Sequence, residues 1–203
     1  MNTIKKTSEI HRTLGKLNRR FRTGAALGIA CLSSLLFVPS KALAQAATLQ
    51  SFLKIDGIQG ESLSTAHPNE IELIGFGAGV ERAAVSTAKP QFYEVSVSKN
   101  VDKASPLLSL NCAVGKSFPT VTLTVAKVGT SGPARDFYKV VLSSVVITKV
   151  ETKGMSGPSG SLTEEVSLSF QKIQWSVMVI DPKTGQPTTT PLAGFDLTKS
   201  SQL

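Results

Sequence analysis

The sequence predicts a mainly β protein, a single antiparallel β-barrel or β-sandwich with one short flanking α-helix. Short segments that alternate between apolar and polar residues recur from residue 52 onward, as in antiparallel strands with one buried face. Segment 105–115 carries helix signals instead. The chain of 203 residues is 41% hydrophobic and 18% charged, which is enough apolar sequence for one ordinary core and excludes a disordered chain.

The first 44 residues are predicted to be a secretory signal peptide. A basic region up to about residue 23 precedes an apolar stretch, 24–38, and then Ala42-Leu43-Ala44. This is the order of a charged region, an apolar region and a cleavage site, so we expect cleavage between Ala44 and Gln45. The apolar stretch has about 15 residues, short of the roughly 20 that cross a bilayer, so no permanent membrane span is expected.

The positive charge of the chain is concentrated in this export segment. The formal net charge is +8, but residues 1–44 carry eight basic residues and one acidic residue, which leaves +1 on the remainder. A basic excess would favour nucleic acid or an anionic membrane as a partner only if it lay on the folded domain. We therefore expect no nucleic-acid partner and interpret the basic excess as a targeting signature.

Two export routes and one alternative are open for this N-terminus. A Sec signal fits the three regions in order, whereas Arg19-Arg20 also permits twin-arginine export. Either route gives a periplasmic or secreted protein with a linker over 45–51 and a domain over 52–203. A misassigned start codon would instead give a cytoplasmic protein that begins near Thr48.

The strands are expected in a regular order along this domain. The first covers Phe52–Ile55 and the second covers 70–73, with alternating segments at 93–98 and 121–125. The glycine-rich segment 75–79 has the spacing G-x-G-x-G, which matches neither a dinucleotide-binding nor a phosphate-loop motif. We expect a bent strand there.

Two longer segments depart from simple alternation. Both parities are apolar in 137–150, which predicts a long strand covered on both sides. In 166–179 the apolar parity switches across Gln171-Lys172, which predicts a bulge or a change of covering surface. Turns are expected at 154–160 and 181–185, and a brief last strand at 194–197.

The helix is predicted from its capping pattern. Ser105 is expected at the N-cap, Pro106 at the first helical position and Gly115 at the stop, which gives about two and a half turns. Its apolar face is predicted to consist of Leu107, Leu110 and Val114.

The predicted domain has few residues that carry chemistry. Its one cysteine, Cys112, and one histidine, His67, can build neither an internal disulfide nor a tetrahedral zinc site. His67 would have to serve any catalytic triad, yet no nucleophile-elbow motif accompanies it. Cys112 lies in an apolar helical pattern and is expected in the core. We therefore expect no enzyme activity, no cofactor and no metal.

In order along the chain, these elements resemble the haemolysin-coregulated protein (Hcp) family, the tube-forming proteins of bacterial type VI secretion. The likeness extends over about 52–199 and depends on an ordered set of motifs. The matching stretches are Phe52-Leu-Lys-Ile-Asp-Gly-Ile-Gln-Gly-Glu-Ser62 with His67 and Glu70-Ile71, then 97–107, Cys112 with Gly115-Lys116 and Pro119, 138–150 and 162–170.

The resemblance implies a non-enzymatic structural protein whose copies form hexameric rings that stack into a tube and carry secreted effectors. It places candidate inter-subunit contacts in the loop 60–70 and in the hairpin around 80–91. Within the loop the candidates are Glu61, Ser62, His67 and Glu70, for which local loop hydrogen bonding is the alternative role.

A second function class is a monomeric periplasmic or extracellular binding module that keeps the fold but not the assembly. The two classes differ in one measurable property, the oligomeric state of the mature domain. The export segment also sets this chain apart, because tube subunits of the family that it resembles are normally loaded from the cytoplasm. A ring-forming protein would have itself as its main partner, with effectors or other secretion-system components as further partners.

Overall fold

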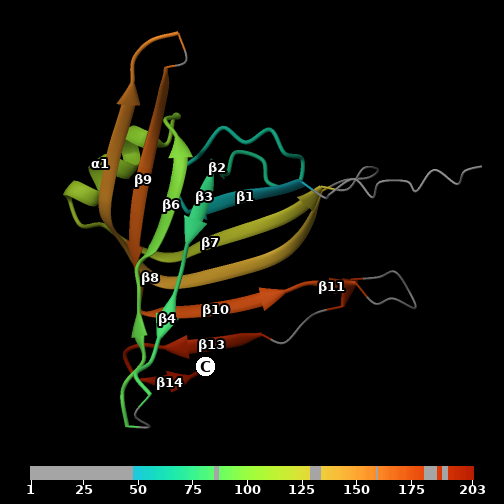
Figure 1. Ribbon diagram of the computed structural model, residues 1–203, viewed down its shortest axis with the longest axis vertical. Helices are drawn as coiled ribbons and strands as arrows, with labels where there is room; N and C mark the ends of the chain where they lie inside the picture. The colour runs from blue at the N-terminus through green and yellow to red at the C-terminus, as the bar shows by residue number, and fades with distance from the viewer. Residues whose placement is uncertain (1–47, 85–86, 129–133, 159, 181–186, 189–191) are drawn as a thin grey trace, which may run out of the picture. The chain divides into compact units, whose positions relative to one another are not determined.

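The computed structural model describes residues 48–84, 87–128, 134–158, 160–180, 187–188 and 192–203 (Figure 1). The predicted signal peptide, the cleavage position at Ala44 and Gln45 and the turn predicted at 181–185 lie outside the described residues.

The described residues form one helix and a succession of strands. In chain order these are β1 (Thr48–Ile55), β2 (Ile71–Leu73), β3 (Gly75–Gly77), β4 (Val80–Glu81), β5 (Gln91–Phe92), β6 (Val95–Asn100), α1 (Ser105–Ala113), β7 (Ser117–Val128), β8 (Arg135–Met155), β9 (Ser161–Ser169), β10 (Lys172–Val177), β11 (Val179–Ile180), β12 (Pro187–Thr188), β13 (Ala193–Asp196) and β14 (Ser201–Gln202).

Ten of these strands pair in one antiparallel sheet. Its main path is β14-β13-β10-β8-β7-β1-β2, and a branch leaves β8 through β9 and β6 to β3. The main path ends at β2 and the branch ends at β3, and these two strands are separated only by Ile74. Both of these ends therefore lie on the same segment of the chain, 71–77. This arrangement curves the sheet around a single core, and α1 lies beside β8 and β9 (Figure 1). The predicted fold class, an antiparallel barrel or sandwich with one short helix, is confirmed.

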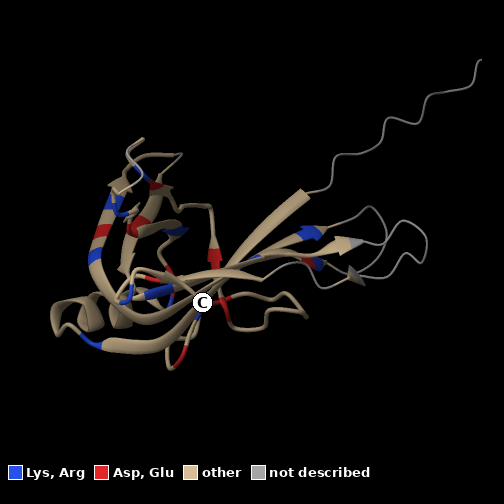
Figure 2. Cartoon of the chain, turned by 90° about the horizontal axis from the view of Figure 1, so that it is seen from below, with Lys and Arg blue, Asp and Glu red and all other residues tan. Residues whose placement is uncertain are grey.

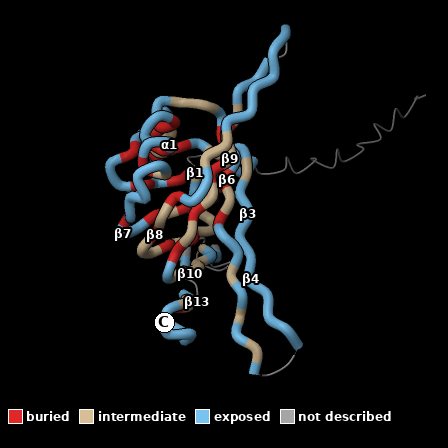
Figure 3. Tube along the Cα trace, turned by 90° about the vertical axis from the view of Figure 1, so that its left-hand side faces the viewer, coloured by how far each residue is buried: buried red, intermediate tan, exposed pale blue. Residues whose placement is uncertain are grey.

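The core is built by the inward-facing residues of the alternating strands. It takes leucine, isoleucine and valine side chains from the pairs β1–β7 and β6–β9, and Leu108 of α1 is fully buried among them. Burial of such side chains contributes about 1.5–3 kcal/mol each. Both hairpin ends that leave the sheet, the β8–β9 end and the β4–β5 arm, are by contrast mostly exposed (Figure 3).

The first strand is longer than the sequence predicts. β1 begins at Thr48, so 48–51 of the predicted linker belong to the strand, where Thr48 pairs with Val128 and Ser51 with Val125. Backbone pairing with the long strand β7 extends β1 through a segment whose own side chains are mostly exposed. That is why alternation alone did not predict these four residues.

Apolar residues occur at both parities of 137–150, but not because both sides of the strand are covered, as was predicted. In the first half of the strand the buried residues are at even positions, Val140 and Leu142. In the second half they are at odd positions, Val145 and Ile147. Between them Ser144 has a positive φ of 53°, which reverses the side-chain alternation. The strand therefore buries mainly one face, and that face changes parity at Ser144.

The change predicted near Gln171-Lys172 is present as a break between two strands and not as a bulge within one. β9 ends at Ser169 and pairs with the second half of β8, whereas β10 starts at Lys172 and pairs with the first half. Within the segment predicted as a turn, 154–160, Gly154 and Met155 still belong to β8, and β9 starts at Ser161. The strand predicted at 194–197 is present as β13, but it is not the last strand, because β14 follows it. The segment 75–79 contains β3 and then leaves the strand, and β4 after it pairs with β5, whereas β3 pairs with β6.

The helix is present but its predicted cap and packing face are wrong. Its N-cap is Ala104, because the Ser105 hydroxyl is drawn into a buried polar cluster described below. The helix buries Leu108 and Asn111 rather than the predicted apolar face. Leu107, Leu110 and Val114 are 42%, 56% and 65% exposed. Cys112 packs against the core, and Gly115 ends the helix with a φ of +64°, both as predicted.

Candidate functional site

A buried ionic cluster fixes the start of α1 to the sheet. Lys99 of β6 is fully buried, and its Nζ lies 2.8 Å from Asp102 Oδ1 and 3.1 Å from Glu164 Oε2. Lys99 and Glu164 are register partners on β6 and β9. The Lys99 ammonium also donates to Ser105 Oγ at 3.1 Å, and that hydroxyl donates to Glu164 Oε2 at 2.6 Å. The cluster thus joins two strands and the first helical residue.

The hydrogen bonds of the cluster keep Glu164 ionised. Burial alone raises the pKa of this carboxyl, but the hydrogen bonds from Ser105 and Lys99 outweigh it, so the pKa is lowered. Thr152 of β8 donates to the second oxygen, Oε1, at 3.2 Å. A buried charge is tolerated when it is paired and hydrogen-bonded in this way.

A second polar cluster holds the loop 56–70. The His67 ring stacks on Phe52 of β1, with 4.4 Å between ring centroids and 18° between planes. Its Nδ1 lies 3.1 Å from Glu70 Oε2, and its Nε2 lies 2.9 Å from Asp136 Oδ1 of β8. His67 therefore ties the loop to two strands that are distant in sequence.

The loop backbone is closed by its own hydrogen bonds. Gly60 N–H donates to Asn69 O at 2.8 Å, and Ser62 N–H donates to Glu70 O at 3.1 Å. The two arms of the loop approach so closely that a Cβ on Gly60 would lie 2.3 Å from Glu70 O. Only glycine fits there.

A groove of about 700 Å³ lies between this loop and the start of α1. Its walls include Ile58, Pro68 and Glu70 from the loop side and Lys103 and Leu107 from the helix side. We call this the loop–helix groove. The His67 cluster fixes one wall and the Lys99 cluster fixes the other, so the groove is held in shape from both sides.

The four predicted contact residues have different positions. Ser62 and His67 are buried, with hydrogen bonds inside the loop, and Glu70 pairs with His67 while lining the loop–helix groove. Glu61 is exposed and accepts a hydrogen bond from the Lys103 N–H at 3.1 Å, across the two elements that form the groove. Every one of them therefore has an intramolecular hydrogen bond, which is the alternative role named above.

Sequence reasoning missed the residues that complete these clusters. In the sequence, Lys99 has the pattern of an ordinary exposed lysine on a strand. Its burial depends on the carboxylate of Glu164, which is 65 residues away. Asp136 precedes the apolar part of β8 and gives no local signal. One available signal was the short spacing of Lys99, Asp102 and Ser105, which brings the end of β6, the connecting segment and the first helical residue close together.

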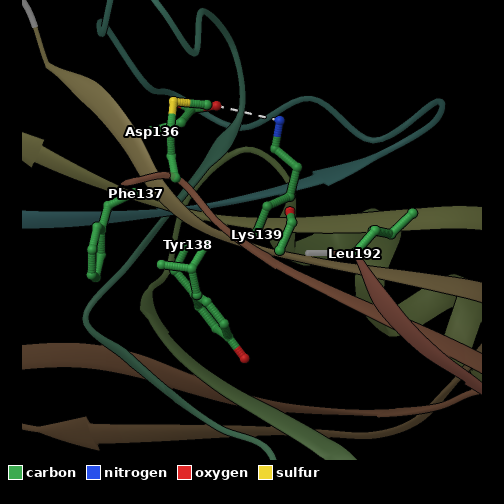
Figure 4. A pocket seen from close by; sticks show the side chains of 8 residues that line it. Asp136, Phe137, Tyr138, Lys139 and Leu192 are labelled. Atoms are coloured by element: carbon green, nitrogen blue, oxygen red, sulfur yellow. Dashed lines mark ion pairs between the residues drawn. The ribbon is translucent and has the colours of Figure 1, made fainter. Parts of the chain in front are cut away.

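A smaller apolar pocket of about 280 Å³ opens between the start of β8 and the end of β10 (Figure 4). Phe137, Tyr138 and Leu192 contribute to its lining, and the Asp136–Lys139 ion pair, 3.3 Å between Oδ2 and Nζ, lies beside it. At the opposite end of β8, charges on the β8–β9 hairpin alternate in sign and pair with one another (Figure 2).

Comparison with protein families decides the assignment. The profile of the family described as "Type VI secretion system effector, Hcp" matches residues 52–177, more than half of the chain. The chain belongs to the Hcp family. The match runs from Phe52 of β1 to Val177 at the end of β10, and so includes both polar clusters and the loop–helix groove.

Individual Hcp proteins are similar over most of this region. Protein hcp1 of Pseudomonas aeruginosa is 30% identical over 130 residues, which are 61% of this chain and 79% of that protein. The crystal structure of Hcp1 from Salmonella typhimurium covers 77% of this chain and 100% of its own, with 26% identity and a TM-score of 0.64. A type VI secretion system effector from Yersinia pestis covers 72% and 98%, with 27% identity and a TM-score of 0.56.

The family consists of structural secretion proteins rather than enzymes, which agrees with the small inventory of catalytic side chains in this Hcp chain. Within the described residues, no three His, Cys, Asp or Glu side chains gather as a metal site would require. The same residues include no helix whose length and apolar character would suffice for a membrane crossing.

Proposed function

We propose that this Hcp chain is an exported structural subunit that associates with copies of itself into a closed hexameric ring. The observation that carries the proposal is the family match over 52–177, which covers the sheet from Phe52 of β1 to the end of β10 and includes the helix. The same proposal includes stacking of rings into a tube and transport of secreted effectors, as the family resemblance implies.

Ring closure requires heterologous contacts, in which one patch of a subunit meets a different patch of the next. The domain carries two separate sets of exposed apolar side chains that suit this role. The first set surrounds the loop–helix groove, with Leu63 at 95% exposure and the outward face of α1. The second set lies on the segment from Ile74 to β5, where Ile74 and Val80 are 61% and 50% exposed. We propose that the first patch of one subunit meets the second patch of its neighbour.

Export by the predicted signal peptide is the second part of the proposal. The family match begins at Phe52, after the predicted cleavage at Ala44, so processing would leave the matched domain whole. The proposed location is therefore the periplasm or the exterior, and Gln45 at the N-terminus of the native protein is the expected result of N-terminal analysis. A native chain that begins at Met1 or near Thr48 would overturn this part.

The oligomeric state tests the ring directly. The mature chain should have about six times the mass of one domain in light scattering behind a sizing column, and rings should be visible by negative-stain microscopy. Leu63→Asp places a charge on the first patch and should shift the protein toward monomers with an unchanged circular dichroism spectrum. Met155→Asp is a matched control, because Met155 is also strongly exposed, at 69%, but lies outside both patches.

The alternative is a monomeric binding module with the same fold. The apolar pocket beside Asp136 and Tyr138 favours it, because a concave apolar site is the usual feature of a ligand-binding domain. A protein that stays monomeric at high concentration, with no rings by microscopy, would establish this alternative and overturn the ring.

A further inference from the structure

The β4–β5 arm is fixed to the sheet by an aromatic anchor. Phe92 at the end of β5 stacks near Trp175 of β10, at 6.3 Å and 19°, and lies 5.1 Å from Phe195 of β13. Its contact with Phe170 is edge-on, at 6.3 Å and 84°. In Figure 1 the arm passes in front of β10 and β13. The base of the arm is thus held in place over the sheet.

A pocket of about 200 Å³ lies where the arm meets the sheet. Four aromatic side chains line it, Tyr93, Tyr138, Phe170 and Trp175, although aromatic residues make up only 6% of the chain. The other lining residues are aliphatic or glycine, and none is basic. Its volume is below the range of about 300–1,000 Å³ that is typical for drug-sized ligands, so it suits a small group.

One carboxylate lies beside the pocket. The Tyr93 hydroxyl donates to the Glu81 carboxylate of β4, and this hydrogen bond raises the pKa of Tyr93. Because Tyr93 itself lines the pocket, the Glu81 carboxylate lies next to the aromatic lining. Gly79 permits this arrangement, because a Cβ there would lie 3.1 Å from the Tyr93 ring.

Aromatic rings with a nearby carboxylate select one class of ligand. Ring faces attract cations, and they do so best when the cation is weakly hydrated and has an apolar outer surface. A methylated ammonium group has these properties, whereas a bare metal ion requires several oxygen, nitrogen or sulfur ligands. We propose that this pocket binds a small alkylated ammonium group such as the trimethylammonium of choline. This inference does not rest on ring formation, although Val80 of the second patch also lines the pocket.

The single tryptophan of the chain, Trp175, lines the pocket and gives a direct readout. Titration of the mature protein with choline chloride should change its emission saturably, whereas equal concentrations of sodium chloride should not. The neutral isostere 3,3-dimethyl-1-butanol has the same shape without the charge, and we expect it to bind about tenfold more weakly. Equal affinity for the two compounds, or no saturable response to choline, would overturn the proposal.

Variants locate the site. Glu81→Gln should weaken choline several-fold and leave the isostere unchanged, because only the charge differs. Tyr138→Leu should weaken choline as well, and Phe76→Leu, outside the pocket on β3, should not. Unaltered choline binding in both Glu81→Gln and Tyr138→Leu would overturn the assignment to this pocket. Sedimentation with phosphatidylcholine vesicles, against phosphatidylglycerol vesicles, distinguishes a lipid headgroup from free choline as the source of the bound group.

Discussion

The two polar clusters on either side of the loop–helix groove differ in how far they are removed from water. The Lys99 side chain is 0% exposed and Glu164 is 3% exposed, whereas the partners of His67, Glu70 and Asp136, are 17% and 27% exposed. The helix wall therefore depends on buried charges that are neutralised by one another and not by water. The loop wall depends on hydrogen bonds that water can partly replace.

This difference teaches which wall of the groove can adjust without loss of the fold. Breaking a buried ion pair leaves an uncompensated charge, so its cost falls on the whole domain. Breaking a partly exposed hydrogen bond costs only about 0.5–1.5 kcal/mol, because solvent takes over the free partner. The helix wall is thus part of the core, and the loop wall is a separately adjustable surface.

The largest expected effect is that of Lys99→Met. It leaves the buried Glu164 carboxylate and the partly buried Asp102 carboxylate without their cation and should lower the free energy of unfolding by about 3–5 kcal/mol, measured by urea denaturation. Lys153→Met is the control, since Lys153 forms exposed ion pairs with Glu151 and Glu165 and should have little effect. Similar losses in both variants would remove the distinction between buried and exposed pairs.

Gly60→Ala tests the loop wall by steric means. The added methyl would meet the Glu70 carbonyl oxygen at 2.3 Å, so the arms of the loop must separate. We expect a loss of about 1–3 kcal/mol in thermal or chemical unfolding. Gly75→Ala is the matched control, because a Cβ at Gly75 meets nothing within 4 Å. Equal stability of the two variants would show that the loop closes without this close approach.

His67→Phe separates stacking from hydrogen bonding. The ring on Phe52 is retained, but the bonds to Glu70 and Asp136 are lost, so we expect about 1 kcal/mol of local destabilisation. Amide hydrogen exchange should accelerate at Gly60, Ser62 and Asn69 and stay unchanged in β7. Faster exchange throughout the sheet would mean that the loop is part of the same cooperative unit as the core.

Acid titration should affect the helix wall only at low pH. The pKa of Glu164 is lowered in the folded protein, so its stabilising contribution is complete above its ordinary value of 4.5 and is lost as the pH falls through the lower folded value. Unfolding midpoints at a series of pH values should therefore fall more steeply below pH 4.5 in the natural protein than in Glu164→Gln. Parallel curves would show that Glu164 is not ionised in the folded state.

The sequence was sufficient for elements whose pattern is local. Alternation located β6 and β7, and Pro106 with Gly115 located the helix. It failed where a distant partner decides the outcome. Ser105 would cap the helix by itself, but Glu164, 59 residues later, captures its hydroxyl. Helical spacing groups Leu107 with Leu110, yet only the sheet determines that the helix buries Leu108 instead.

The candidate site also has one part that the sequence indicated and one part that it did not. The resemblance to Hcp pointed to Glu61, Ser62, His67 and Glu70, and all four lie in one closed loop. No pattern in the sequence indicated that Asp136 would meet His67, because the two residues are 69 positions apart and only the strand order brings them together.

The change of parity at Ser144 divides β8 into two halves, and this division has a consequence for how the domain unfolds. Strand β8 spans 21 residues and is shared between two parts of the sheet, since its first half pairs with β10 and its second half with β9. Strand β7 pairs with β8 on both sides of Ser144. Neither half of the sheet can separate while β8 stays in place. A pulling force or a protease that acts on one half must therefore disrupt the other, so we expect a single all-or-none transition with no stable half-domain.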